Sequence, residues 1–305
     1  FQSWRTSPSH SLIASHLRMD SLRRLAIEAA AEGLLSDAGV NSLPINPIQI
    51  AEHLAITISS KPPSAKGASG WLIRSGEEYG IVYATHIDSI GFQHFSIAHE
   101  LGHFTLDGHP EHVFRNSNGH ASRAGFEAID HIEREADYFA ACLLMPKHLC
   151  RRLISRSHDG MAAVQYLANQ CKASLTAAAL RYAEIGQLPI GIVQAYQGKV
   201  EFCAAYPMQA HVGWARPLMR NAKVPADSAT HRLSADNDAV LHSVEDSDSC
   251  EAGDWFPSAD RKAGLIEEVI GLGKFGRTLT VLTLDPDSTQ DEEEEDDHLE
   301  EARFR

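Results

Sequence analysis

The segment HFSIAHELGHFTLDGH, residues 94–109, restricts what this chain can fold into more than any other stretch. It contains four histidines and one glutamate, but no lysine or arginine. His99 and His103 are four residues apart, so on a helix both imidazoles project from one face and can reach a single metal ion. Ala98 and Gly102 give the same helix a small, close-packing surface, which predicts that it is buried. Buried histidine and glutamate side chains are costly unless a metal or a partner group satisfies them, so the segment predicts a buried metal site.

Glu100 lies between the two histidines and completes an H-E-x-x-H pattern. On a helix it is rotated away from the ligand pair, where it can accept a proton from a water molecule rather than bind the ion. A chance match to so short a pattern is the competing interpretation, and the close-packing context favours a metal site. We therefore predict His99 and His103 as metal ligands and Glu100 as a general base.

Catalytic zinc needs a third protein ligand, and the spacing leaves two choices open. His109 lies six residues after His103, as in the extended H-E-x-x-H-x-x-G-x-x-H pattern, but Leu106 occupies the position where that pattern needs glycine. Glu133 lies on a second predicted helix, four residues before Asp137, so these two carboxylates share a face. In such a pair the glutamate can bind the metal while the aspartate orients a ligating histidine.

The composition disfavours several classes of protein. No apolar run of about 18 residues occurs, so no transmembrane helix is expected. The five cysteines are scattered without a C-x-x-C pair, which favours reduced thiols in a cytoplasm and disfavours a cysteine zinc cluster. The formal net charge of -14 disfavours binding of nucleic acid through a broad basic face. Residues 285–305 hold eleven acidic residues and two arginines, and this acidic block predicts a disordered tail.

Local patterns predict an α+β fold. The first helix, over residues 19–39, is expected to bury a face that includes Leu22 and Leu25. Residues 110–125 are polar and are expected to form a loop. Further helices are expected over residues 45–56, 94–109 and 127–145, and two more within 160–185. Single strands are expected over 55–60 and 277–284, and hairpins over 69–84 and 190–205.

Two stretches, FSIAHELGHF and EREADYFAACLLMP, make the chain similar to the ImmA/IrrE family of bacterial and phage metallopeptidases. The similarity spans residues 21–186. It implies a zincin-like site in which Glu133 is the third ligand, beside the two histidines and the base already identified. It implies zinc as the cofactor, with another divalent metal such as manganese as the alternative.

The resemblance also implies roles for the remaining carboxylates of the second predicted helix. Asp137 takes a position that the family often fills with asparagine, and the resemblance implies that it orients a ligating histidine. Glu135 is the lesser alternative ligand. His109 becomes a neighbour of the metal site rather than a ligand.

The expected organisation has four parts. Residues 1–18 form a leader, which is either a tag remnant or disordered. Residues 19–187 form a zincin-like metallopeptidase domain, with helices, a small sheet and a C-terminal helix pair. Residues 188–284 form a smaller, mixed β-rich domain that senses a signal or recruits substrate, and residues 285–305 form the acidic disordered tail.

The resemblance implies a cytoplasmic zinc endopeptidase of narrow specificity. Its expected substrate is a helix-turn-helix transcriptional repressor, and cleavage would derepress stress, DNA-damage or mobile-element genes. The alternative is a non-proteolytic, metal-containing regulator that binds and displaces a repressor; an intact Glu100 favours the peptidase. Neither membrane binding nor direct DNA binding is expected, and the oligomeric state stays open.

Some expectations concern the surroundings of the site. The strand over residues 79–84 either pairs with extended substrate as a sheet edge or is purely structural. Residues 164–186 have a helix-turn-helix cadence, but the second helix offers only Arg181 as a cation, which favours a structural or protein-binding helix pair. Four residues are candidates for stabilising an oxyanion: Tyr83, His112, His120 and His131.

Overall fold

The structure is a computed structural model of the 305-residue chain. It describes residues 19–61, 67–86, 89–122, 130–154, 159–186, 188–205, 208, 211–212, 218–256, 259 and 263–286. The predicted leader, residues 1–18, and residues 287–305 of the predicted acidic tail lie outside the described residues. Among the residues described, no helix is both long enough and apolar enough to cross a membrane.

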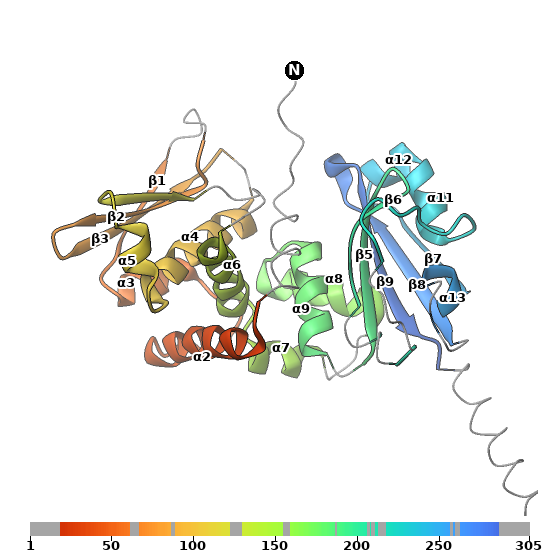
Figure 1. Ribbon diagram of the computed structural model, residues 1–305, viewed down its shortest axis with the longest axis horizontal. Helices are drawn as coiled ribbons and strands as arrows, with labels where there is room; N and C mark the ends of the chain where they lie inside the picture. The colour runs from red at the N-terminus through yellow and green to blue at the C-terminus, as the bar shows by residue number, and fades with distance from the viewer. Residues whose placement is uncertain are drawn as a thin grey trace, which may run out of the picture. The chain divides into compact units, whose positions relative to one another are not determined.

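The chain divides into two compact units. The first comprises Phe1–Ser157 and Gln165–Arg181, and the second comprises His158–Val164 and Tyr182–Arg305. Both units combine helices with a sheet (Figure 1). The predicted α+β class is therefore confirmed.

The first unit contains a four-stranded sheet in the order β1-β3-β2-β4. Strand β1 runs parallel to β3, and β2 runs antiparallel to both β3 and β4. Helix α4 packs against β2 and β3 and also against α6. The strands are β1 (Thr57–Lys61), β2 (Gly70–Ser75), β3 (Glu78–Ala84) and β4 (Gly119–Ser122). The helices are α2 (Ser21–Asp37), α3 (Pro47–His53), α4 (Ile90–Thr105), α5 (His109–Val113), α6 (His131–Leu144) and α7 (Lys147–Ile154), and the two units share α8 (Gly160–Cys171) and α9 (Leu175–Ile185).

Several local predictions hold because their signals are short-range. The helix predicted over residues 45–56 forms as α3, where the Asn46 side chain accepts a hydrogen bond from the backbone of Ile48 and Pro47 is the first helical residue. The predicted hairpin over residues 69–84 forms from β2 and β3. The predicted second hairpin, over residues 190–205, forms from β5 (Ile190–Tyr196) and β6 (Lys199–Ala204).

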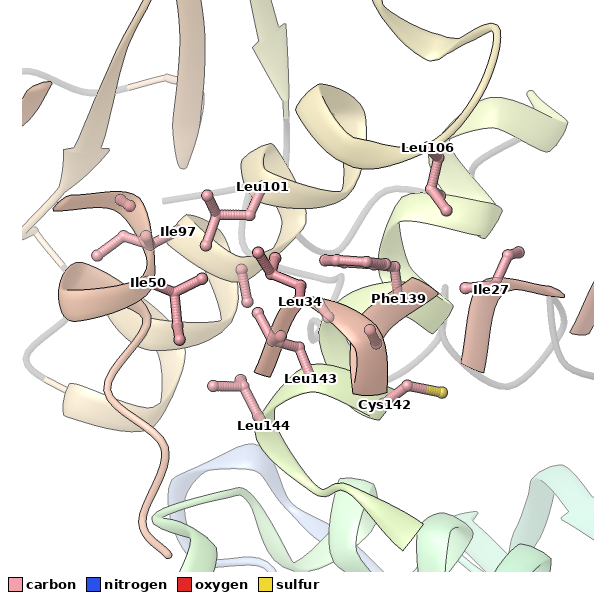
Figure 2. Close-up of a cluster of buried hydrophobic side chains, with 14 of the residues drawn as sticks. Ile27, Leu34, Ile50, Ile97, Leu101, Leu106, Phe139, Cys142, Leu143 and Leu144 are labelled. Atoms are coloured by element: carbon pink, nitrogen blue, oxygen red, sulfur yellow. The ribbon is translucent and has the colours of Figure 1, made fainter. Parts of the chain in front are cut away.

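The predicted buried face of the first helix was wrong. Leu22 is 73% exposed and Leu25 is 59% exposed. The face that α2 buries against α6 includes Ile27 and Leu34 instead (Figure 2). The helix contains apolar residues on more than one stripe, so periodicity by itself did not select the stripe that meets the core.

The loop predicted over residues 110–125 was also wrong in part. Helix α4 ends at Thr105, and Gly108 adopts a left-handed backbone with φ of 83° before α5 begins. Residues 119–122 then form β4, which pairs with β2. The short segment GHAS carries little strand propensity of its own, so the distant partner strand decides its conformation.

Close packing of α4 on α6 fixes the positions of the polar side chains that these two helices carry. A Cβ atom at Gly102 would lie 3.1 Å from Phe139 Cδ1 and 3.2 Å from Ala136 Cα. Only glycine therefore lets the two helices approach this closely without displacement. Leu101 of α4 and Leu143 of α6 lie fully buried in the same apolar cluster (Figure 2).

The second unit contains a five-stranded antiparallel sheet in the order β6-β5-β9-β8-β7. Strand β9 (Arg277–Leu284) was predicted, but β7 (Glu245–Glu251) and β8 (Gly264–Gly271) were not. Strand β7 has the sequence EDSDSCE and lies at the sheet edge, largely exposed, so it shows no apolar alternation. The remaining elements are α11 (Ala229–Ala235), α12 (Asn237–Leu241), α13 (Ala252–Trp255) and η1 (Gly273–Phe275).

A buried ion pair joins α2 to α9 in the first unit. Arg181 is 2% exposed; its Nη2 donates to Glu28 Oε1 over 2.7 Å, and its Nε donates to the Met145 carbonyl over 2.9 Å. Burial by itself raises the pKa of the Glu28 carboxyl, but Arg181 and Lys147 outweigh burial and hold this pKa below its ordinary value. The pair contributes stability only while Glu28 is ionised.

We expect Arg181→Met to lower the free energy of unfolding by about 3–5 kcal/mol, because it leaves the Glu28 carboxylate buried beside fewer donors. Urea unfolding at pH 7 measures the loss. The double variant Glu28→Leu/Arg181→Met should recover most of it, since it removes both buried charges. Equal losses in the single and double variants would contradict the ion-pair explanation.

The pH dependence follows from the lowered pKa of Glu28. A carboxyl whose pKa is depressed by folding stabilises the protein above its unfolded pKa, and this contribution is lost as pH falls through the folded pKa. Below about pH 4.5, the ordinary value for glutamate, the unfolding free energy of the wild type should therefore fall relative to that of the double variant. Above that pH the difference between the two proteins should stay constant. Urea unfolding across that range measures it.

Candidate metal centre

Three side chains from two helices meet at one point in the first unit. His99 and His103 lie one turn apart on α4, and Glu133 lies in the first turn of α6. The two Nε2 atoms are 3.0 Å apart, and each lies 3.3 Å from one of the two Glu133 carboxylate oxygens. In a tetrahedral site with metal–ligand bonds of about 2.0–2.1 Å, ligand atoms lie about 3.3 Å apart. The donor set and its spacing therefore fit a zinc ion, and among the described residues these three form a group able to hold one.

Asp137 holds one of these histidines from behind. Its Oδ1 accepts a hydrogen bond from His99 Nδ1 over 2.8 Å. This hydrogen bond keeps a proton on Nδ1, so Nε2, which faces Glu133, is the nitrogen that can bind a metal once it carries no proton. The structure thus brings Asp137 to the position that its spacing from Glu133 predicted.

The protonation of the group follows from burial and contacts. Burial lowers the pKa of His103 to about 3, so this ring is neutral. Burial also disfavours charge on His99, but hydrogen bonds to Asp137 and Glu133 raise its pKa well above the ordinary value. Burial alone would raise the pKa of Glu133, yet the three surrounding histidine rings lower it, so it is a carboxylate. The group therefore offers anionic and imidazole donors, and His99 must release a proton to become a ligand.

Glu100 is fully buried beside the group, and neither of its carboxylate oxygens has a hydrogen-bond partner among the described residues. Burial raises its pKa to about 7 and outweighs the His99 and His120 rings and the Ser122 hydroxyl, which lower it. The Ser122 hydroxyl is near Glu100 but does not reach hydrogen-bond geometry. A Cβ atom at Gly70, on β2, would lie 2.5 Å from Glu100 Oε1, so the bare backbone of this strand makes the space that the carboxylate occupies. An unpaired buried carboxylate with a pKa near neutrality suits a general base.

The two alternative ligands are not brought to the group. His109 opens α5 rather than lying on α4, so the prediction of one helix over residues 94–109 was wrong at its end. Its Nδ1 lies 3.3 Å from Nδ1 of His103, on the side of that ring away from Glu133. Glu135 faces His109 and Arg23 instead of the ligand atoms.

One of the four candidates for an oxyanion donor lies at the group. His120, on β4, places its Nε2 2.9 Å from Glu133 Oε1, and its ring centroid lies 4.7 Å from that of His103. His112 and His131 are exposed and lie near Asp130. The fourth candidate, Tyr83, packs against the hydrophobic cluster.

Of the two alternatives left open for residues 79–84, the structure excludes the sheet edge and favours the structural strand. These residues belong to β3, which is hydrogen-bonded to β1 on one side and to β2 on the other. Strand β4 is the edge strand beside the metal group, and within the described part of the chain it pairs with β2 alone. Residue order along the chain did not reveal this, because β4 joins the sheet through a long-range pairing.

Arg181, the one cation that the sequence offers on the second helix of the predicted helix pair, faces the interior of the first unit. As described above, it is buried and bonded to Glu28 and Met145. The helices α8 and α9 form as expected, over Gly160–Cys171 and Leu175–Ile185.

Comparisons with known proteins agree with this geometry. Residues 51–182 match the family model of the M78 peptidases, described as the IrrE N-terminal-like domain. No curated protein matches the chain. The fold is similar to that of a solved Mycobacterium tuberculosis transcriptional regulator, with a TM-score of 0.55 and 12% identity over 91% of this chain and 82% of that chain; at this identity the likeness concerns the fold alone. The resemblance stated from the sequence is confirmed over residues 51–182, which match the model of the IrrE N-terminal-like domain of the M78 peptidases.

Proposed function

We propose that this protein is a cytoplasmic, zinc-dependent endopeptidase of narrow specificity that cleaves a helix-turn-helix transcriptional repressor. One observation carries the proposal: an unpaired, fully buried Glu100 carboxylate lies beside a group of three side chains spaced for a metal ion. A purely structural metal site does not need such a carboxylate, which is costly to bury without a partner. Hydrolysis needs it as a base.

The metal group supplies the first requirement of the reaction. His99, His103 and Glu133 would hold the ion, and three protein ligands leave one position of a tetrahedral site for water or substrate. Zinc held there would supply a lowered pKa of water and the polarisation of a carbonyl. Manganese remains the alternative metal.

Side chains of the protein carry out the proton transfers. Glu100 accepts a proton from the attacking water and can return it to the amide nitrogen that leaves. Its pKa of about 7 suits both steps, because the carboxyl gains and loses a proton at similar cost near neutral pH. His120, which contacts Glu133 from β4, is the candidate to donate a hydrogen bond to the carbonyl oxygen as it becomes negative.

The sheet edge supports a peptide as the substrate. Residues 119–122 of β4 carry His120 at the metal group and form an edge strand, to which an extended peptide can add by backbone hydrogen bonds. Folded proteins offer extended, exposed segments mainly in linkers and loops. A repressor's interdomain linker meets this requirement, and cutting it separates DNA binding from dimerisation. The separated halves would bind each operator half-site singly, which weakens repression and derepresses stress, DNA-damage or mobile-element genes.

The second unit is the candidate for regulation. We assign residues 188–284 to sensing a signal or recruiting the repressor. Its five-stranded sheet and helices have a hydrophobic core of their own, so it can act as a separate module.

We expect Glu100→Gln to keep zinc near one equivalent while abolishing cleavage, because Glu100 accepts the proton and does not bind the ion. Metal analysis of the purified variant and gel assays of a repressor encoded nearby measure the two properties. Glutamine keeps the size of the side chain, so folding should be retained. Cleavage by the zinc-loaded variant at the wild-type rate would contradict the assigned role.

We expect Glu133→Ala to lose most of its zinc, because two histidines alone bind the ion weakly. Glu111→Ala, which changes an exposed glutamate of α5, is the matched control and should keep its zinc. Affinity measured by chelator competition should rise with pH in the wild type, because His99 must release a proton. Full zinc occupancy in Glu133→Ala would mean that another residue is the third ligand.

Selectivity separates the peptidase from the non-proteolytic regulator. We expect the zinc-loaded protein to make one discrete cut in the repressor and to leave casein, an unfolded general substrate, largely intact. The Glu100→Gln variant should bind the repressor without cutting it. Stable repressor binding without cleavage by the wild type would favour the regulator that displaces a repressor, and rapid digestion of casein would contradict narrow specificity.

A further inference from the structure

A chain of polar side chains runs behind His103, on the side away from the metal group. His103 Nδ1 lies 3.3 Å from His109 Nδ1, and His109 Nε2 lies 3.0 Å from Glu135 Oε2. Arg23 closes the chain by donating from Nε to the same carboxylate oxygen over 2.9 Å. His103 and His109 are fully buried, whereas the Arg23 side chain is 34% exposed.

The donors and acceptors of this chain fit one arrangement of protons. Arg23 can only donate, so Glu135 accepts as a carboxylate. His109 then donates from Nε2 to Glu135, and its Nδ1 faces Nδ1 of His103, so one of these two nitrogens donates and the other accepts. A His103 ring that binds a metal through Nε2 carries its proton on Nδ1. His103 must donate from Nδ1 to His109. The lone pair of His103 Nε2 therefore faces Glu133, where a metal ligand needs it.

The end of α4 makes this contact possible. On a continuous helix a residue six positions after His103 would be rotated by about 240° from it and would face elsewhere. The helix instead ends at Thr105, and Gly108, with its left-handed backbone, lets the chain turn so that α5 begins at His109. This ending, rather than a longer helix, returns the His109 ring to the back of His103.

Helix α6 contributes a carboxylate to each side of His103. Glu133 and Glu135 are two residues apart and are rotated by about 200° on the helix, so they face opposite ways. Glu133 lies at the ligand atoms, and Glu135 lies behind them against His109. Asp137 already holds His99 directly, so each of the two histidine ligands has a partner at Nδ1.

We propose that His109, Glu135 and Arg23 position the metal ligand His103 by fixing its tautomer and ring orientation. His109 is thus a positioning residue rather than a ligand. The inference rests on the metal site of the proposed function. Partners of this kind change metal affinity by about 10–100-fold when they are removed.

The test compares zinc affinity, by chelator competition, in the full-length wild type, His109→Phe and His109→Gln. Phenylalanine fills the space without hydrogen bonding, so we expect zinc to bind about 10–100-fold more weakly. Glutamine can accept from His103 and donate to Glu135, so it should restore the greater part of the affinity. The matched control is His112→Phe, which changes an exposed histidine of the same helix and should bind zinc as the wild type does.

A spectroscopic readout separates positioning from a general loss of stability. The absorption bands of the cobalt-loaded protein report ligand geometry; they should shift in His109→Phe and stay unchanged in His112→Phe. Equal zinc affinities in the wild type and His109→Phe, or a His109→Gln variant as weak as His109→Phe, would overturn the proposal. Absence of zinc binding by the wild type would instead overturn the proposed function.

A second variant keeps the test decisive if His109→Phe does not fold. Arg23→Met removes the outer end of the chain, where the side chain is partly exposed, and leaves the buried rings unchanged. We expect weaker zinc binding than in the wild type, because Glu135 loses the cation that keeps it an acceptor. Unchanged zinc affinity in a folded Arg23→Met protein would show that Arg23 takes no part in positioning His103. If His109→Phe also fails to fold, this result would overturn the proposal.

Discussion

The contact between α4 and α6 holds the metal group together. His99, Glu100 and His103 come from one helix and Glu133 from the other, so the ligand spacing depends on how closely the helices approach. Gly102 permits this approach, since a Cβ atom there would press against Ala136 and Phe139. The apolar residues around the contact are buried, which makes the helix pair a rigid support for the polar groups (Figure 2).

Rigid support is needed because the group is buried as well as polar. Buried charges and imidazoles are costly unless each has a partner. Asp137 and His109 provide partners behind the two histidine ligands, and Glu135 with Arg23 extends the second of these contacts. Glu100 is the exception, because its carboxylate has no hydrogen-bond partner among the described residues. The fold thus satisfies the side chains that would hold an ion and leaves unsatisfied the one that we assign to proton transfer.

Strand β4 connects this group to the surface on which a peptide could lie. It is short, it pairs with β2 in register, and it carries His120 to the Glu133 carboxylate. On the neighbouring strand, a Cβ atom at Gly70 would clash with the Glu100 carboxylate, so only glycine leaves the space that this side chain occupies. The small sheet is therefore part of the site: its backbone shapes the space around Glu100, and its edge strand is the one to which we propose that a substrate peptide adds.

The sequence by itself determined the features that depend on short-range spacing. The four-residue separations His99–His103 and Glu133–Asp137 place each pair on one helical face, whatever the rest of the chain does. The same holds for the start of α3 at Asn46 and for the first hairpin. These features were enough to predict the α+β class and to select the two histidines and the glutamates that the structure brings together. The choice of Glu133 over His109 needed the family resemblance, because spacing admitted both.

Only the tertiary structure decided which surfaces meet. The sequence did not show which stripe of α2 is buried, because several apolar stripes were available and α6 selected one. It did not show that β3 is a central strand or that β4 forms the edge, since both depend on pairing between distant segments. The position of His109 behind His103 depends on where α4 ends and how the chain turns at Gly108. Short-range spacing determines which residues share a face of one element, whereas packing between elements determines what that face contacts.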